Sequence, residues 1–134
     1  MIESLIIEKT GTTPHIKFDV TNFEFLMKGE CRPENVLTFF TPVLKWLTQF
    51  KSWTSNQSTL PKNQIEFHFQ IEYYNSSSAK FLFNIFERLS FLAEEGVNVK
   101  INWYYDELDE DLLENGKEFE KILTLDFSYI PIKD

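Results

Sequence analysis

The sequence predicts an α/β fold: a mixed β-sheet with an antiparallel meander at its N-terminal end and helices that mainly cover one face. Segments near residues 15–20, 23–28 and 65–71 alternate apolar and polar residues, which is typical of strands with one buried face. A two-residue turn separates the first two segments, so we expect them to pair antiparallel. After residue 64, strand patterns alternate with helical patterns, which indicates β-α-β crossovers and parallel strands.

The length of the chain, 134 residues, suits one domain that spans residues 1–134. Its 14 Phe, 5 Tyr and 3 Trp supply the side chains for a largely aromatic core. The single cysteine, Cys31, excludes an internal disulfide and is expected to be a small apolar packing residue. The sequence shows neither a signal peptide nor an apolar run of membrane-spanning length, which predicts a cytoplasmic protein without membrane insertion.

Six strands are expected from the alternation and from the turn residues that bound it. They lie near residues 2–8, 15–20, 23–28, 64–73, 97–105 and 122–130. Because most of these segments alternate, helices are predicted to cover one face of the sheet while the other face stays largely open.

Three helices are expected, near residues 33–50, 76–94 and 107–118. Pro33 is placed in the first turn of the first helix, where its missing N–H costs nothing. Pro42 falls inside the same helical pattern and is expected to kink the helix or to divide it in two. Residues 51–63 are rich in Ser, Thr and Asn and are expected to form an exposed loop.

The helix expected near residues 76–94 carries an apolar stripe at helical spacing. Phe83 falls at the edge of this stripe and is expected to be partly exposed, and Gly96 is expected to end the helix. The residues that the stripe should bury are Leu82, Ile85, Phe86, Leu89 and Leu92.

Charge and histidine placement argue against several classes of function. The net charge of −8 disfavours nucleic acid and anionic membranes as partners. His15 and His68 each lie on the polar side of a strand, and neither has the spacing of a metal ligand. The acidic residues within 106–120 fit a solvated helix start better than acid–base chemistry or a calcium loop. The sequence therefore predicts no enzyme activity, no catalytic residue, no metal site and no cofactor.

The most informative segment, residues 65–80, runs from a strand through three serines into a helix. Ser76 is the best N-cap candidate, with Asn75 before it. Free backbone N–H groups and the helix dipole favour an anion at such a position. No acidic residue lies between residues 73 and 86, and Lys80 lies one turn into the helix, where it would pair with a phosphate. The residues alone leave open a phosphoacceptor site and a simple helix cap, and physical chemistry by itself favours the cap.

Three segments, in order along the chain, resemble the SiaC-type regulatory phosphoproteins, a family of small STAS-like bacterial proteins related to anti-sigma-factor antagonists. Residues 73–80, Tyr-Tyr-Asn-Ser-Ser-Ser-Ala-Lys, are similar to the family's aromatic-aromatic-Asn-Thr/Ser-Ser-Ser-x-Lys motif. The other two segments lie within residues 32–47 and 99–106, so the resemblance covers nearly the whole chain. It places Ser76 at the phosphoacceptor position, where many members carry Thr, and Ser77 is the second choice.

The resemblance implies a non-enzymatic switch of a partner-switching pathway. It implies phosphorylation by a dedicated serine/threonine kinase and dephosphorylation by a PP2C-type phosphatase. The unmodified form is then expected to bind and activate an output protein, a diguanylate cyclase, and so to raise cyclic di-GMP and favour biofilm or aggregation. The partner-binding residues that the resemblance implies are Tyr73, Tyr74, Asn75, Ser77, Ser78, Lys80 and Phe83.

Two other classes of function stay open from the sequence. One is a constitutive protein–protein interaction or dimerisation module, in which exposed aromatic residues such as Tyr74, Phe83 and Tyr104 pair chains and the serines only cap a helix. The other is a small-ligand sensor, for which the sequence shows no pocket motif.

Overall fold

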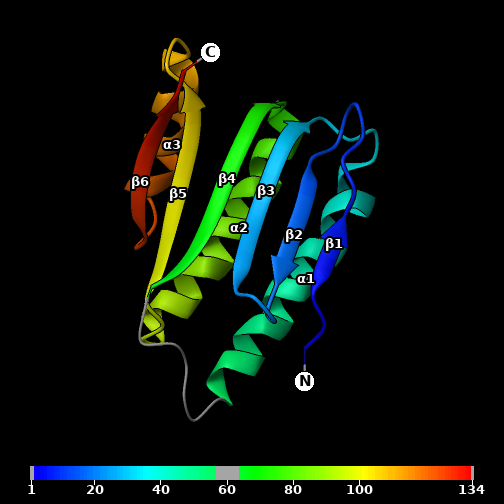
Figure 1. The fold of residues 1–134 in the computed structure, drawn as a ribbon, viewed down its shortest axis with the longest axis vertical. Coiled ribbons are helices and arrows are strands. Elements are labelled where there is room, and N and C mark those ends of the chain that lie inside the picture. The colour runs from blue at the N-terminus through cyan, green and yellow to red at the C-terminus, as the bar shows by residue number, and fades with distance from the viewer. Residues whose placement is uncertain (1, 57–63, 134) are drawn as a thin grey trace.

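The computed structural model describes residues 2–56 and 64–133 and contains a six-stranded sheet and three helices (Figure 1). The strands are β1 (Leu5–Ile7), β2 (His15–Asp19), β3 (Glu24–Cys31), β4 (Ile65–Tyr74), β5 (Val99–Asp106) and β6 (Asp126–Ile132). The helices are α1 (Val36–Ser55), α2 (Ser76–Glu94) and α3 (Glu110–Lys121).

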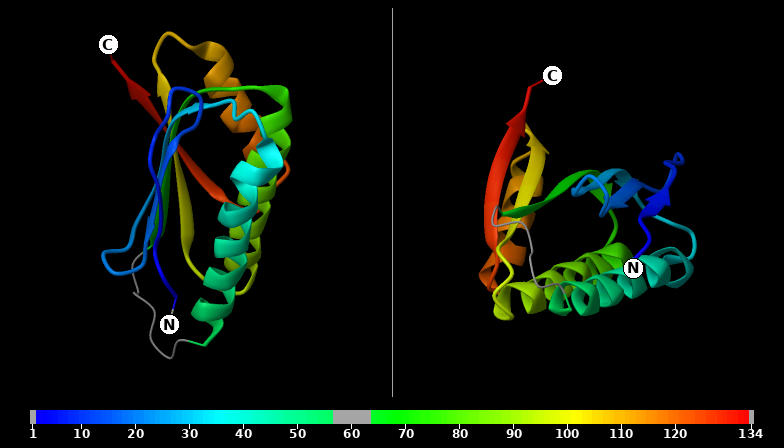
Figure 2. Two further views of the ribbon diagram at one scale, coloured as in Figure 1. Left: turned by 90° about the vertical axis from the view of Figure 1, so that its right-hand side faces the viewer. Right: turned by 60° about the horizontal axis from the view of Figure 1, so that its bottom comes forward.

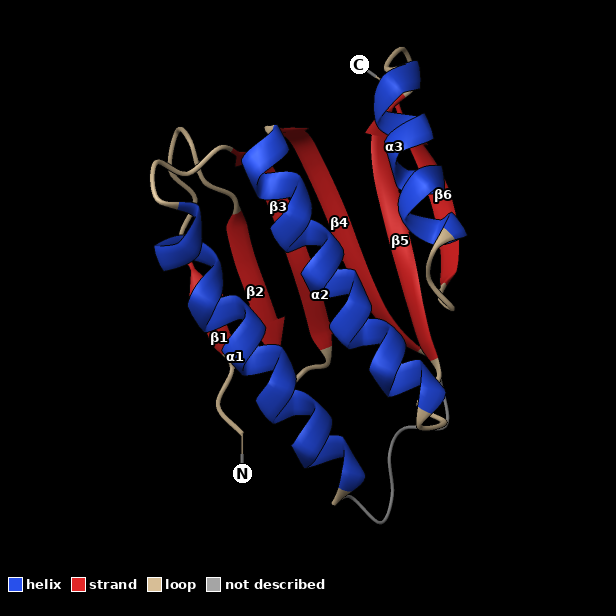
Figure 3. Cartoon of the chain, turned by 180° about the vertical axis from the view of Figure 1, so that it is seen from behind, coloured by secondary structure: helices blue, strands red, loops and turns tan. Residues whose placement is uncertain are grey.

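The strands lie side by side in the order in which they occur in the chain. β1, β2 and β3 form an antiparallel meander, whereas β3, β4, β5 and β6 run parallel and are joined by the three helices. All three helices lie on one face of the sheet, with α1 beside α2, and α3 packed against β5 and β6 (Figures 2 and 3). The predicted α/β fold, with its meander and its one covered face, is confirmed.

The boundaries of α1 differ from the prediction in three ways. The N-cap is Asn35, whose Oδ1 accepts a hydrogen bond from the Thr38 N–H at 3.0 Å, so Pro33 lies before the helix and not in its first turn. The helix is not divided at Pro42, because side chains on both sides of the proline pack into the core and outweigh a cost of roughly 3 kcal/mol. Residues 51–55 are helical and not a loop, and the rest of that predicted loop, residues 57–63, lies outside the described residues.

β3 extends three residues beyond its predicted end because Gly29 interrupts the alternation without ending the strand. Gly29 has a φ of 128°, which favours glycine, and an added Cβ would come within 3.3 Å of the Pro14 Cα. The register between β3 and β4 shifts at this point, since Gly29 pairs with Ile71 but Glu30 pairs with Tyr73. This bulge leaves Glu72 without a partner on β3 and changes the direction of the residues after it.

Aromatic rings from the sheet and from the helices pack against one another in the core. Phe25 of β3 and Phe67 of β4 stack with ring centroids 4.5 Å apart, and Phe50 of α1 lies 5.4 Å from Phe25. On the other side of the core, Phe86 of α2 lies 4.8 Å from Phe69 of β4. The predicted apolar stripe of α2 is buried as a whole: Leu82, Ile85, Phe86, Leu89 and Leu92.

α3 packs against β5 through a tryptophan and a glycine. Trp103 of β5 is buried, and its Nε1–H donates a hydrogen bond to the carbonyl oxygen of Leu112 at 3.0 Å. Gly116 lies one turn further along α3, where an added Cβ would come within 2.7 Å of Trp103 Nε1. The distance between α3 and the sheet therefore requires a residue without a side chain at this position.

Replacing Gly116 with Ala should lower the free energy of unfolding by roughly 1–3 kcal/mol, because the new methyl group displaces Trp103 or the helix. Ala is otherwise the better helix former, so a neutral or stabilising result would contradict this packing. The matched control is Gly11→Ala, where nothing lies within 4 Å of the added Cβ and a change within about 0.5 kcal/mol is expected. Urea denaturation at equilibrium measures both variants.

Candidate functional site

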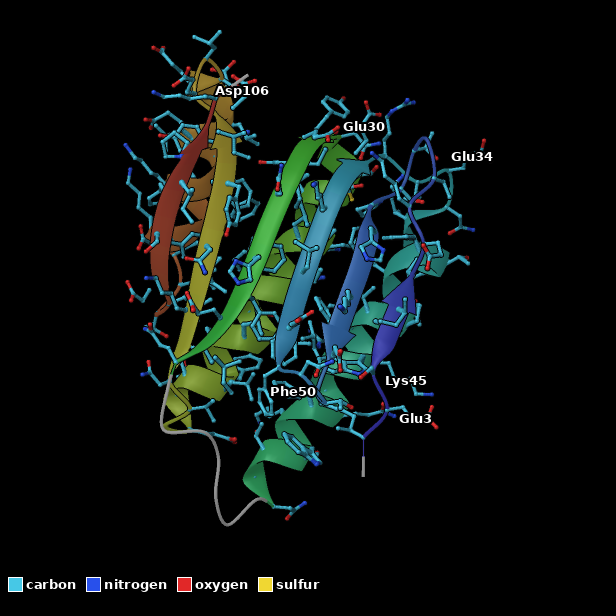
Figure 4. All side chains as sticks on the ribbon, in the orientation of Figure 1. Glu3, Glu30, Glu34, Lys45, Phe50 and Asp106 are labelled. Atoms are coloured by element: carbon cyan, nitrogen blue, oxygen red, sulfur yellow. The ribbon has the colours of Figure 1, made fainter. Side chains whose placement is uncertain are left out.

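The junction between β4 and α2 lies at the edge of the sheet where the parallel strands end. Glu30 at the end of β3 and Asp106 at the end of β5 lie at the same edge (Figure 4). Ligand and partner sites of α/β sheets gather at this edge, because each strand ends there and each helix that follows begins there. The predicted phosphoacceptor segment, which includes Ser76, is at this position.

Asn75, and not Ser76, is the N-cap of α2. Asn75 Oδ1 accepts a hydrogen bond from the Ser78 N–H at 3.0 Å, and the Asn75 carbonyl oxygen accepts one from the Ala79 N–H at 3.1 Å. The prediction that Ser76 caps the helix is therefore wrong, since the amide of Asn75 already satisfies the free N–H group. Ser76 is the first residue of the helix, and its hydroxyl is not needed to cap it.

Ser76 and Ser77 are both exposed, but their hydroxyls differ in what they contact. Ser77 Oγ donates a hydrogen bond to Asn75 Oδ1 at 3.1 Å and so takes part in the cap. Ser76 makes none of the capping hydrogen bonds found in the described part of the chain. A kinase would therefore reach Ser76 without breaking a contact of the cap, whereas modification of Ser77 would remove a donor from it.

Ser78 is fully buried, with 0% of its surface exposed, and faces the core beside Cys31. Its Oγ makes no hydrogen bond of good geometry among the described residues, although it lies near enough to the Cys31 thiol to lower the pKa of that thiol in part. Burial raises the pKa of the Cys31 thiol to about 11, so the group stays protonated at neutral pH, as expected of a packing residue. The predicted contact between Ser78 and a partner does not fit this burial.

The two tyrosines before the cap point in different directions. Tyr73 is 52% exposed at the surface of the edge. Tyr74 follows the bulge and turns toward the helices, where its ring centroid lies 6.2 Å from that of Phe119 on α3. Burial, together with the nearby carboxylate of Glu118, raises the pKa of Tyr74 to about 12. Tyr73 is thus available to a partner, whereas Tyr74 is half-buried and supports the junction.

Ser76, Lys80 and Phe83 lie along one face of α2, because their spacing of four and then three residues matches the helical repeat. Lys80 is exposed, and none of the four ion pairs found among the described residues includes it. Phe83 is half-buried. By sequence, no acidic residue lies in the first turn of α2. The helix start therefore presents its dipole and one lysine to an incoming phosphate without an opposing charge.

The histidines have structural partners on the open face of the sheet. His68 Nδ1 lies 2.9 Å from the Tyr104 hydroxyl, and His15 Nδ1 donates to the carbonyl oxygen of Ile7 at 2.9 Å. Within residues 2–56 and 64–133, no group of three or more His, Cys, Asp or Glu side chains is placed to hold a metal ion. None of the helices in these ranges combines the length and apolar character needed to cross a membrane.

A family model described as SiaC family regulatory phosphoprotein matches residues 7–132, which includes every element of the sheet except the first two residues of β1. The chain belongs to the SiaC family. Its serine-rich motif is therefore found in a family of regulatory phosphoproteins, and the exposed helix start described above is where the family resemblance places the modified residue.

Three matches from Pseudomonas aeruginosa, two of which are structures of the same protein, show how far the likeness extends. An uncharacterized protein of strain UCBPP-PA14 is 28% identical over 127 residues, which is 95% of each chain. The crystal structure of apo-SiaC has a TM-score of 0.81 at 26% identity, covering 96% of this chain and 99% of that one. SiaC also matches, with a TM-score of 0.82, 26% identity and the same coverage, in the crystal structure of the diguanylate cyclase SiaD in complex with its activator SiaC.

Alanine substitutions across the junction should separate the cap from the modification site. Asn75→Ala should lower the free energy of unfolding by about 1 kcal/mol, because it removes the acceptor for the Ser78 N–H. Ser76→Ala should change it by no more than about 0.5 kcal/mol. Ser78→Ala should leave it unchanged or raise it by up to about 1 kcal/mol, because a buried hydroxyl without a partner is removed.

Urea denaturation of the four proteins, measured side by side, checks this order. A loss in Ser76→Ala as large as that in Asn75→Ala would show that Ser76 stabilises the helix start after all. A large loss in Ser78→Ala would show that its hydroxyl has a partner, such as a bound water.

Proposed function

We propose that this chain is a phosphorylation-controlled activator of a diguanylate cyclase and that Ser76 is its phosphoacceptor. The observation that carries the proposal is the exposed Ser76 hydroxyl, free of the cap, at a helix start without acidic residues in a member of a regulatory phosphoprotein family. The relative SiaC is the activator of the cyclase SiaD in their joint crystal structure, which supports the same kind of output here.

Two opposing enzymes are part of the proposal. A serine/threonine kinase adds the phosphate and a PP2C-type phosphatase removes it, so that the unmodified form activates the cyclase and raises cyclic di-GMP. The surface that the partner contacts is formed by three exposed residues and two half-buried ones, which are Tyr73, Ser77 and Lys80, and Asn75 and Phe83. The chain itself performs no catalysis, and its effect is exerted through binding.

The phosphate would act on the partner and not on the fold. It adds about −1.5 to −2 charges at pH 7 to a chain whose net charge is −8. The dipole of α2 and Lys80 stabilise this charge locally, so the stability of the fold should shift by roughly 1 kcal/mol or less. A partner packed against Tyr73 and Asn75 would have to desolvate the phosphate, at a cost of several kcal/mol. Phosphorylation should therefore release the partner.

Incubation with the cognate kinase and ATP should add one phosphate, at Ser76. Intact-mass and fragment-ion mass spectrometry measure the number of phosphates and their positions. Ser76→Ala should prevent the modification, whereas the matched control Ser77→Ala should be modified as wild type is, because its Ser76 hydroxyl is unchanged. A phosphate that persists in Ser76→Ala, or that is found on Ser77, would contradict the site.

Phosphorylated protein should bind the cyclase at least a hundredfold more weakly than unmodified protein, while its melting temperature changes by only a few degrees. Titration calorimetry measures binding, and differential scanning calorimetry measures the melt. Ser76→Ala exposed to kinase and ATP is the control and should bind as unmodified protein does. Equal binding of the phosphorylated and unmodified forms would favour the constitutive interaction module, with Tyr73 as its exposed aromatic residue.

A further inference from the structure

A cleft separates β4 from β5 at the edge of the sheet where the parallel strands end. These two strands pair from Ile65–Val99 as far as Phe69–Trp103 and then part. Beyond this point β4 continues to pair with β3, and β5 continues to pair with β6. The space between them has a volume of about 820 Å³, and the start of α3 contributes to its lining.

Both walls of this cleft are strand edges without a neighbour. Residues 70–74 of β4 have β3 as their neighbour on one side only, with Glu72 left out of that pairing by the bulge. Residues 104–106 of β5 pair with β6 on one side only. Alternate backbone N–H and C=O groups of such a strand point away from its one partner. A free edge of this kind accepts an extended chain as an added strand. The cleft thus offers backbone hydrogen bonds on its walls.

The charged side chains that line the cleft are all negative. Its lining contains neither Lys nor Arg, and no ion pair within the described residues involves its carboxylates. Apolar residues share the lining with these acids, among them Ile71 and Ile132, and Leu108 is 81% exposed. The five carboxylates are Glu72, Asp106, Asp109, Glu110 and Asp111.

We propose that this cleft binds an extended segment of a partner protein that carries Lys or Arg at alternate positions. The segment pairs its backbone with the free edge of β4 and directs its basic side chains to the carboxylates of β4 and α3. An extended chain fits because the walls are strand edges, and a basic chain fits because every charged side chain of the lining is a carboxylate. The proposal goes beyond the switch at Ser76, which does not line the cleft.

A fluorescein-labelled seven-residue peptide that alternates Lys with Val tests this proposal by fluorescence anisotropy at low salt. The triple variant Glu72→Gln, Glu110→Gln, Asp111→Asn should bind it at least about tenfold more weakly than wild type, given three lost charge pairs. The matched control neutralises three exposed acids outside the cleft and should bind as wild type does: Glu8→Gln, Glu34→Gln and Glu94→Gln.

A second peptide separates backbone pairing from charge. N-methylation of alternate residues removes the backbone N–H donors along one edge of the extended peptide but keeps every lysine. Wild-type protein should bind this peptide at least tenfold more weakly than the unmethylated one. In wild-type protein, the unmethylated peptide should slow amide exchange at residues 70–74 and leave exchange at residues 15–19 of β2 unchanged. The exchange measurement needs no variant and so decides the question even if the triple variant fails to fold.

Three results would overturn the proposal. In the first, the triple variant binds the peptide as tightly as its matched control, which would make the attraction a matter of net charge. In the second, the N-methylated peptide binds as tightly as the unmodified one. In the third, the protein sediments as a dimer that the triple variant dissociates and the peptide does not bind, which would assign the cleft to a second copy of this chain. Ser76→Ala should bind the peptide as wild type does, so failure of the switch and failure of the cleft are distinguishable.

Discussion

Phe86 of α2 packs between two parts of the sheet, β1–β4 and β5–β6. These parts separate at the edge where the parallel strands end. The Phe86 ring lies 4.8 Å from Phe69 on β4, 5.1 Å from Phe119 on α3 and 5.4 Å from Phe127 on β6. β4 and β5 pair over only their first halves, so contacts through this ring hold β5, β6 and α3 against the rest of the molecule.

The start of α2 and the acidic cleft before α3 lie at the same edge of the sheet, where the parallel strands end. Crossovers between parallel strands pass over the same face, so α2 and α3 both begin where β4 and β5 end. The start of α2 has no acidic residue and presents its dipole beside Lys80, whereas the cleft before α3 is lined by carboxylates. A chain with a net charge of −8 thus keeps one helix start favourable for an added phosphate.

A modification of Ser76 would leave the junction between β4 and α2 stable, because the neighbouring residues make the contacts that stabilise it. Asn75 caps the helix, Ser78 packs beside Cys31, and Tyr74 packs against Phe119. A charge added to the exposed hydroxyl meets solvent and leaves these contacts in place. The same separation would make the proposed phosphorylation at Ser76 compatible with a stable helix start in the adjacent residues.

The sequence by itself determined the kind and order of the elements, the buried stripe of α2, the lack of acids at its start and the family to which the serine motif belongs. These properties are local, since alternation and helical spacing report which side chains share a face. It did not determine that Asn75 caps the helix, that α1 continues through Pro42, or that Ser78 is buried. The parting of β4 and β5 depends on where each strand stops pairing, which is set by packing between residues far apart in the chain and not by the pattern of either strand.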